Sequence, residues 1–168
     1  MQTAPATNEA TPPGWDKARA HAIIDGMKAT EGAALPMLHA LQEAFGYVPH
    51  PAEAMMAEAL NLSRAEIRGI ISFYHDFRQA PAGRHVMKLC VAEACQSMGG
   101  PGVAERLLTR LGIGWGETTT DGSLTVEKVY CLGLCACAPA ALLDDVPVGR
   151  LDDDTATLLA AEAAGGMT

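Results

Sequence analysis

Apolar residues recur every three to four positions through residues 15–80, the spacing of one face of an α-helix. Gly32 and Gly46 are typical helix stops, and Pro36 suits a first helical turn because a proline lacks the N–H that would be unpaired there. Ser63 and Glu66 have the spacing of a capping box. The pattern predicts a bundle of four short helices, the third over residues 53–60 and the fourth opening after Ser63.

The period changes after the stretch of small residues and proline at 80–83. Residues 85–90 and 124–130 are predicted strands, and residues 101–111 carry apolar positions at helical spacing. Residues 141–143 and 147–149 suit a hairpin, and the acids at 152–154 suit the start of a last helix. The order strand, helix, strand, hairpin, helix predicts an α/β domain over 84–168, while residues 1–14, rich in Pro, Thr and Ala, are predicted to be a disordered tail.

The composition of the chain excludes several classes of function. With 49% apolar and 19% charged residues, the 168-residue chain is predicted to be soluble and globular. No window is apolar enough for a membrane span or a signal peptide, so we expect a cytoplasmic protein. A net charge of -8 argues against nucleic acid, since phosphate binding depends on Lys and Arg. Neither a G-x-G-x-x-G motif nor a Walker loop is present, so we do not expect this chain alone to bind NAD or FMN.

All five cysteines lie within residues 90–137, which favours metal binding or redox chemistry over structural disulfides in a cytosolic protein. Their spacing is Cys90-x4-Cys95 and Cys131-x3-Cys135, with Cys137 beyond. If the intervening helix is a right-handed crossover between parallel strands, Cys90 and Cys131 lie at the same sheet edge and the two pairs meet.

Four thiolates can hold a 2Fe-2S cluster or a zinc ion, and a dithiol redox site is a third alternative. The x4 and x3 loops suit the wider cluster better than a tight zinc knuckle. Gly99, Gly100 and Gly133 would let backbone N–H groups approach sulfur, and Leu132 and Leu134 would shield the site. Pro139 is a candidate for a cis peptide bond, although trans is the usual state.

Two segments carry a family resemblance, CVAEACQSMGG and VYCLGLCACAPAALLDD. They resemble the thioredoxin-like 2Fe-2S ferredoxin family, the small flavoprotein-associated subunit of respiratory NADH dehydrogenase and its relatives. LPMLHALQEAFGYVPHPAEAMMAEAL and SRAEIRGIISFYHDFR resemble the N-terminal helical segment of that family. Within the family, the motifs are most similar to the gamma subunit of soluble NAD-dependent formate dehydrogenase.

The resemblance implies a thioredoxin-like α/β domain preceded by an N-terminal helical bundle, with a 2Fe-2S cluster ligated by Cys90, Cys95, Cys131 and Cys135. Cys137 is then a packing residue. The implied function is one-electron transfer, without a substrate site of its own, beside a flavin- and NAD-binding subunit. Formate would be oxidised at a molybdenum or tungsten site in a catalytic subunit with further iron–sulfur clusters. Respiratory NADH-quinone oxidoreductase and NAD-reducing hydrogenase are the alternative complexes, while a thiol-disulfide oxidoreductase and a zinc-stabilised interaction module are alternatives to electron transfer.

Overall fold

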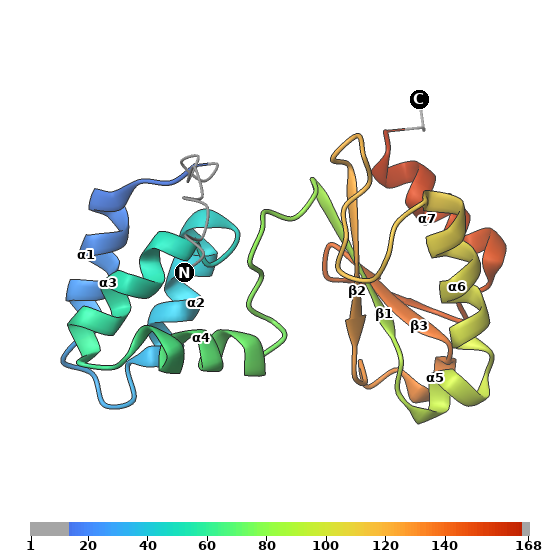
Figure 1. Cartoon of the computed structure of the whole chain (residues 1–168). Coiled ribbons are helices and arrows are strands. Elements are labelled where there is room, and N and C mark those ends of the chain that lie inside the picture. Colours follow the sequence, from blue (N-terminus) through green and yellow to red (C-terminus); the bar gives the residue numbers. More distant parts are fainter. Residues whose placement is uncertain (1–13, 166–168) are drawn as a thin grey trace, which may run out of the picture. The chain divides into compact units, whose positions relative to one another are not determined.

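The computed structural model describes residues 14–165. The chain divides into two compact units, Met1–Pro81 and Ala82–Thr168 (Figure 1). Of the tail predicted over residues 1–14, all but Gly14 lies outside the described residues.

The first unit is built from four helices that share one core. They are α1 (Lys17–Met27), α2 (Ala34–Phe45), α3 (His50–Leu60) and α4 (Arg64–Phe73). Each contributes fully or almost fully buried side chains, among them Ile24, Met37, Met56 and Ile71. Helices are therefore present wherever the apolar spacing predicted them within residues 15–80.

Local chemistry fixes where these helices begin. Ser63 Oγ accepts the Glu66 backbone N–H at 3.2 Å, and the Ser63 N–H donates to Glu66 Oε2 at 2.7 Å, so the predicted capping box is present. The start predicted for the third helix, residue 53, is wrong by three residues. Helix α3 starts at His50 because Pro51 lies in its first turn, where a proline is tolerated.

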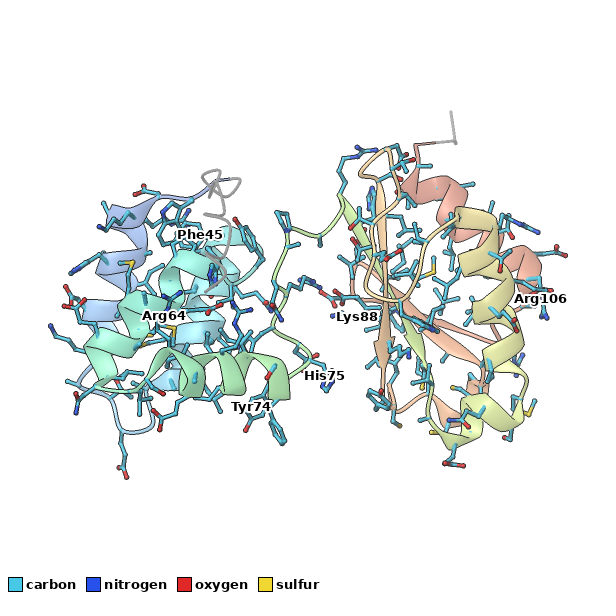
Figure 2. All side chains as sticks on the ribbon, in the orientation of Figure 1. Phe45, Arg64, Tyr74, His75, Lys88 and Arg106 are labelled. Atoms are coloured by element: carbon cyan, nitrogen blue, oxygen red, sulfur yellow. The ribbon has the colours of Figure 1, made fainter. Side chains whose placement is uncertain are left out.

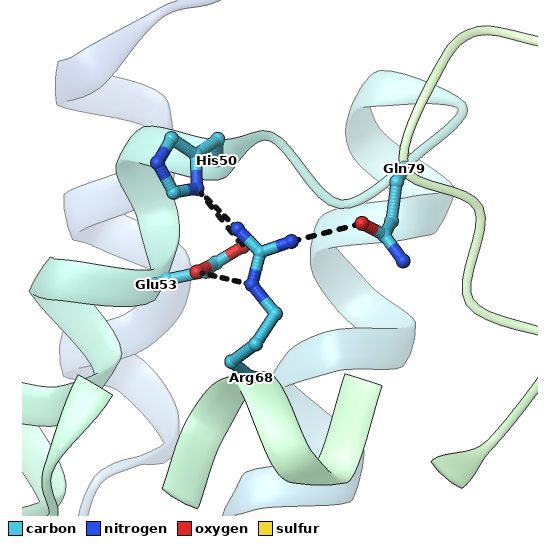
Figure 3. A network of polar contacts seen from close by, with 4 residues as sticks. All are labelled: His50, Glu53, Arg68 and Gln79. Carbon is cyan, nitrogen blue, oxygen red and sulfur yellow. Dashed lines mark hydrogen bonds and ion pairs between the residues drawn. The ribbon is translucent and has the colours of Figure 1, made fainter. Parts of the chain in front are cut away.

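A polar network connects α4, and the segment that follows it in sequence, to α3 (Figure 3). Arg68 holds the buried Glu53 carboxylate through Nε at 3.1 Å and Nη2 at 2.9 Å, and its Nη1 donates to Gln79 Oε1 at 2.9 Å. Arg68 Nη2 also lies 2.7 Å from His50 Nδ1. The network therefore fixes the chain as far as Gln79, close to the end of the unit.

The second unit is a four-stranded mixed sheet with helices. Its elements are β1 (His85–Cys90), α5 (Glu93–Ser97), α6 (Gly100–Leu111), β2 (Leu124–Val129), the 3-10 turn η1 (Cys135–Cys137), β3 (Ala140–Leu143), β4 (Val146–Gly149) and α7 (Asp153–Ala163). The sheet order is β2-β1-β3-β4. Strands β1 and β2 are parallel, so the condition for the two cysteine pairs to meet is fulfilled, while β3 runs antiparallel to both β1 and β4. Helix α5 was not predicted; it begins between Cys90 and Cys95 and contains Cys95.

Helices α6 and α7 pack side by side on one face of the sheet (Figure 1). Their apolar residues, such as Leu107 and Ala160, share a core with Met87 and Val126 of the strands. Arg106 projects from the outside of α6 (Figure 2). Its Nε pairs with an Asp153 oxygen at 2.7 Å and links the two helices. Within residues 14–165, no helix is long and apolar enough to cross a membrane.

Candidate iron–sulfur centre

Two cysteine pairs gather at the carboxyl ends of the parallel strands. Cys90 is the last residue of β1, and it is in register with Val129, the last residue of β2 and two positions before Cys131. Cys95 lies in α5 and Cys135 opens η1. The helix α6 lies in the crossover between the parallel strands β1 and β2, so both strands finish at one edge.

The two thiols of each pair lie close together, and the two pairs are close enough to affect each other's pKa values. Cys131 Sγ lies 3.8 Å from Cys135 Sγ, and Cys90 and Cys95 pack together in one buried cluster. Burial raises the pKa of Cys95, and its neighbours Cys90 and Cys135 raise it further, since a second negative charge nearby disfavours a thiolate. The pKa of Cys135 is raised mainly by its hydrogen bond with Cys131.

Backbone N–H groups are directed at the sulfur atoms. Burial alone would raise the pKa of Cys90, but the N–H groups of Ala92, Cys131 and Leu132, together with Cys95, bring it below its ordinary value. The Gly133 N–H donates to Cys131 Sγ at 3.4 Å. Such converging N–H groups stabilise a negatively charged ligand, as expected for thiolates bound to iron.

The loop that supplies these donors has an uncommon backbone. Cys131 has a φ of 81° and Gly133 a φ of 75°, both in the left-handed region. For a residue with a side chain this conformation costs on the order of 1–3 kcal/mol, and such residues cluster at functional sites. In this loop the Gly133 N–H points at Cys131 Sγ, and N–H groups placed in this way around a negative ligand are typical of an anion-binding nest.

The two pairs differ in their access to solvent. Cys90 and Cys95 are buried, whereas Cys131 and Cys135 are exposed. Leu132 and Leu134, which are predicted to shield the site, pack against the buried pair. Cys137 is half-buried, and its Cβ lies against Gly149 of β4. The Ala138–Pro139 peptide bond behind it is cis.

Some donors were not anticipated from the sequence. The backbone groups of Ala92 and Leu132 lower the pKa of Cys90 and that of Ala140 lowers the pKa of Cys95, and nothing in these residue types signals such a role. Gly100, predicted to let N–H groups approach sulfur, lies instead against the carbonyl of Cys95.

The donor set fits a cofactor with two metal ions. The four thiols form two pairs, and in a 2Fe-2S cluster each iron takes two thiolates. Four soft sulfur donors supported by backbone N–H groups are the ligands that such a cluster prefers.

A mixed sheet of this order, covered by helices and carrying paired thiols at one edge, defines a thioredoxin-like class of small iron–sulfur and thiol redox proteins. The model of the family described as thioredoxin-like [2Fe-2S] ferredoxin matches residues 20–163. The chain belongs to this family, and its cofactor is a 2Fe-2S cluster.

Individual relatives extend over most of the chain. It is 35% identical over 122 residues to a subunit of the NADH-quinone oxidoreductase of Pseudomonas aeruginosa, covering 73% of this chain and 74% of that protein. It is 29% identical over 129 residues to the HndA subunit of the NADP-reducing hydrogenase of Solidesulfovibrio fructosivorans, covering 77% of this chain and 75% of that protein. These relatives are subunits of oxidoreductase complexes.

A solved structure has the same fold over a similar range. The air-oxidised NAD⁺-reducing [NiFe]-hydrogenase superimposes with a TM-score of 0.62 at 30% identity, covering 78% of this chain. The match spans only 23% of the hydrogenase chain, so this chain corresponds to one part of a longer protein there.

Proposed function

We propose that Cys90, Cys95, Cys131 and Cys135 ligate the 2Fe-2S cluster and that the chain is a one-electron carrier. The observation that carries this proposal is the meeting of two cysteine pairs, 35 residues apart in sequence, beside converging backbone N–H groups. When bound, the cluster accepts and releases single electrons. The protein holds the thiolates in place, limits water at the buried pair and supplies N–H groups that stabilise the added negative charge.

The carrier works, in this proposal, within a cytoplasmic NAD(P)-linked oxidoreductase, next to a subunit that binds flavin and NAD. Support comes from the relatives, which are subunits of an NADH-quinone oxidoreductase and of a hydrogenase. A cluster can pass on singly the two electrons that a flavin receives together from NADH.

A separate question is which oxidoreductase complex contains this chain. The motif resemblance favours NAD-dependent formate dehydrogenase, with its molybdenum or tungsten subunit, whereas the relatives described above support NADH-quinone oxidoreductase or NAD-reducing hydrogenase better. Affinity purification of the tagged chain from its native cells, followed by mass spectrometry of the co-purifying subunits, separates these complexes. Recovery of a flavoprotein with a formate dehydrogenase catalytic subunit supports the first, and recovery of hydrogenase or quinone-reductase subunits supports the others.

The ligand assignment has a direct test. Purified without oxygen, the full-length protein should be red-brown, contain about two irons and about two acid-labile sulfides per chain, and give a paramagnetic signal after reduction. Replacing Cys90, Cys95, Cys131 or Cys135 with serine should each remove or cripple the cluster absorbance. The matched control Cys137→Ser should retain it. A colourless protein with bound zinc, or one in which a dithiol titrates without iron, would support the zinc module or the thiol-disulfide oxidoreductase instead.

A further inference from the structure

Two glycines outside the cysteine spacing lie directly against the loops that carry the thiols. A Cβ at Gly100 would lie 2.7 Å from the carbonyl oxygen of Cys95 and 3.2 Å from its carbonyl carbon. A Cβ at Gly149 would lie 2.7 Å from the Cβ of Cys137 and 3.1 Å from its carbonyl oxygen. Carbon atoms normally approach to roughly 3.5–4.0 Å, so a side chain at either position requires the neighbouring loop to move.

The close approach, and not the backbone conformation, is what requires glycine here. Neither Gly100 nor Gly149 has a positive φ, so another residue could adopt either backbone conformation. Gly99, next to Gly100, is the opposite case: its φ is 85°, and a Cβ there would meet no atom within 4 Å.

A side chain at residue 100 would displace the helix that contains Cys95. Gly100 begins the twelve-residue helix α6, whose Val103 and Leu107 are buried in the core of this unit. Cys95 belongs to the five-residue helix α5. Because α6 is anchored by its buried side chains and α5 is a single short turn, a Cβ at residue 100 displaces Cys95.

At Gly149, the contact is with the turn that holds Cys135. Gly149 is paired with Ala140 in the β3–β4 ladder, and the next N–H, that of Arg150, donates to the Cys137 carbonyl at 2.6 Å. Cys135 and Cys137 belong to the same three-residue turn η1, closed by the Cys137 N–H to the Leu134 carbonyl at 2.8 Å. A Cβ at residue 149 pushes on this turn and shifts Cys135 relative to Cys131.

We infer that Gly100 and Gly149 are positioning residues for the iron–sulfur centre, each giving a cysteine loop the space it needs to place one thiol of its pair. The inference rests on the proposed ligand set. It extends the site beyond the two cysteine motifs to the start of α6 and the end of β4.

The test compares the alanine variants Gly100→Ala and Gly149→Ala with wild type in the full-length protein, purified without oxygen. Gly102→Ala is the matched control, because a Cβ at residue 102 meets only the guanidinium end of the Arg106 side chain, which can rotate away. Cluster loss to an iron chelator is followed by visible absorbance, the reduced cluster by electron paramagnetic resonance, and folding by far-ultraviolet circular dichroism. We expect both variants to lose the cluster roughly tenfold faster or more, with altered g values, while Gly102→Ala matches wild type.

A second-site variant distinguishes positioning from general destabilisation. Cys137→Gly removes the Cβ that Gly149→Ala would strike most closely, while the Cys137 carbonyl oxygen at 3.1 Å remains, so the double variant should regain part of the wild-type cluster lifetime and move its g values back towards wild type. The same Cys137→Gly change should not rescue Gly100→Ala, whose contact is with the backbone of Cys95. If Gly100→Ala fails to fold, the Gly149 and Cys137 variants decide the matter.

The inference is overturned if Gly149→Ala keeps the wild-type lifetime and g values, if Cys137→Gly does not rescue it, or if Cys137→Gly alone abolishes the cluster. If the proposed function were wrong, the result would be different: the wild-type protein itself would hold no iron and no sulfide.

Discussion

Removing Arg68 should destabilise the helical unit far more than removing another arginine from the same helix. The Glu53 side chain is only 4% exposed, and Arg68 reaches both of its carboxylate oxygens, at 3.1 and 2.9 Å. In an Arg68→Met variant the methylene stem is largely retained while Glu53 loses this cation. The carboxylate would then be buried without its main counter-charge.

The size of the effect follows from the burial of the two partners. Removing one partner of a fully buried ion pair costs about 3–5 kcal/mol. Arg68 is 42% exposed, so water already screens part of the interaction. Allowing for that screening, we expect Arg68→Met to lower the free energy of unfolding of this unit by about 2–3 kcal/mol.

The two tryptophans permit a measurement specific to each unit. Trp15 packs on Phe45 in the helical unit, with ring centroids 5.5 Å apart, and Trp115 packs in the core of the second unit. Urea unfolding followed by Trp15 fluorescence in a Trp115→Phe background reports on the helical unit alone. A shift of the midpoint with an unchanged slope reports a change in stability.

Arg64→Met is the control, since Arg64 is exposed in the first turn of α4, where a positive charge is unfavourable to the helix dipole. It should change stability by no more than about 0.5 kcal/mol. If Arg68→Met were equally mild, water or another group would have to solvate Glu53, and the reasoning from burial would be refuted.

Three further outcomes follow from particular contacts. Ser63→Ala removes the side-chain acceptor of the Glu66 N–H, so it should lower the free energy of unfolding of the helical unit by about 1 kcal/mol in the same Trp15 assay. Met87→Ala leaves a cavity at a fully buried position of β1 and should lower the free energy of unfolding of the second unit by about 2–5 kcal/mol. The measurement is Trp115 fluorescence in a Trp15→Phe background. The control, Met98→Ala at an exposed position, should lower it by less than about 0.5 kcal/mol. The hydroxyl of Thr119 and the hydroxyl and N–H of Ser123 lower the pKa of Asp121 to about 2 from 3.8. Its stabilising contribution is therefore present above about pH 4 and lost as the pH falls towards about 2, and Asp121→Asn should lack this loss in urea titrations at successive pH values. An equal acid-side loss in wild type and Asp121→Asn would contradict this assignment.

Local signals in the sequence located most of the helices and strands. The Ser63–Glu66 capping box, the glycine after Phe45 and the acids before α7 act over one helical turn, so they can be recognised without knowledge of the fold. Where a local signal was absent, the prediction missed. Helix α5 has five residues and no side-chain cap, and its burial of Cys95 depends on contacts made far away in sequence.

The sequence by itself predicted the four cysteines that we propose as ligands, because two cysteine pairs at these spacings are distinctive and thiolates are the ligands that iron–sulfur clusters prefer. Only the tertiary structure decided the order of the strands, the close approach of Gly100 and Gly149 to the cysteine loops, and which backbone N–H groups face the sulfur atoms. Every residue except proline has an N–H group, so residue type does not reveal where that group points. Its direction is set by packing between segments that are distant in sequence.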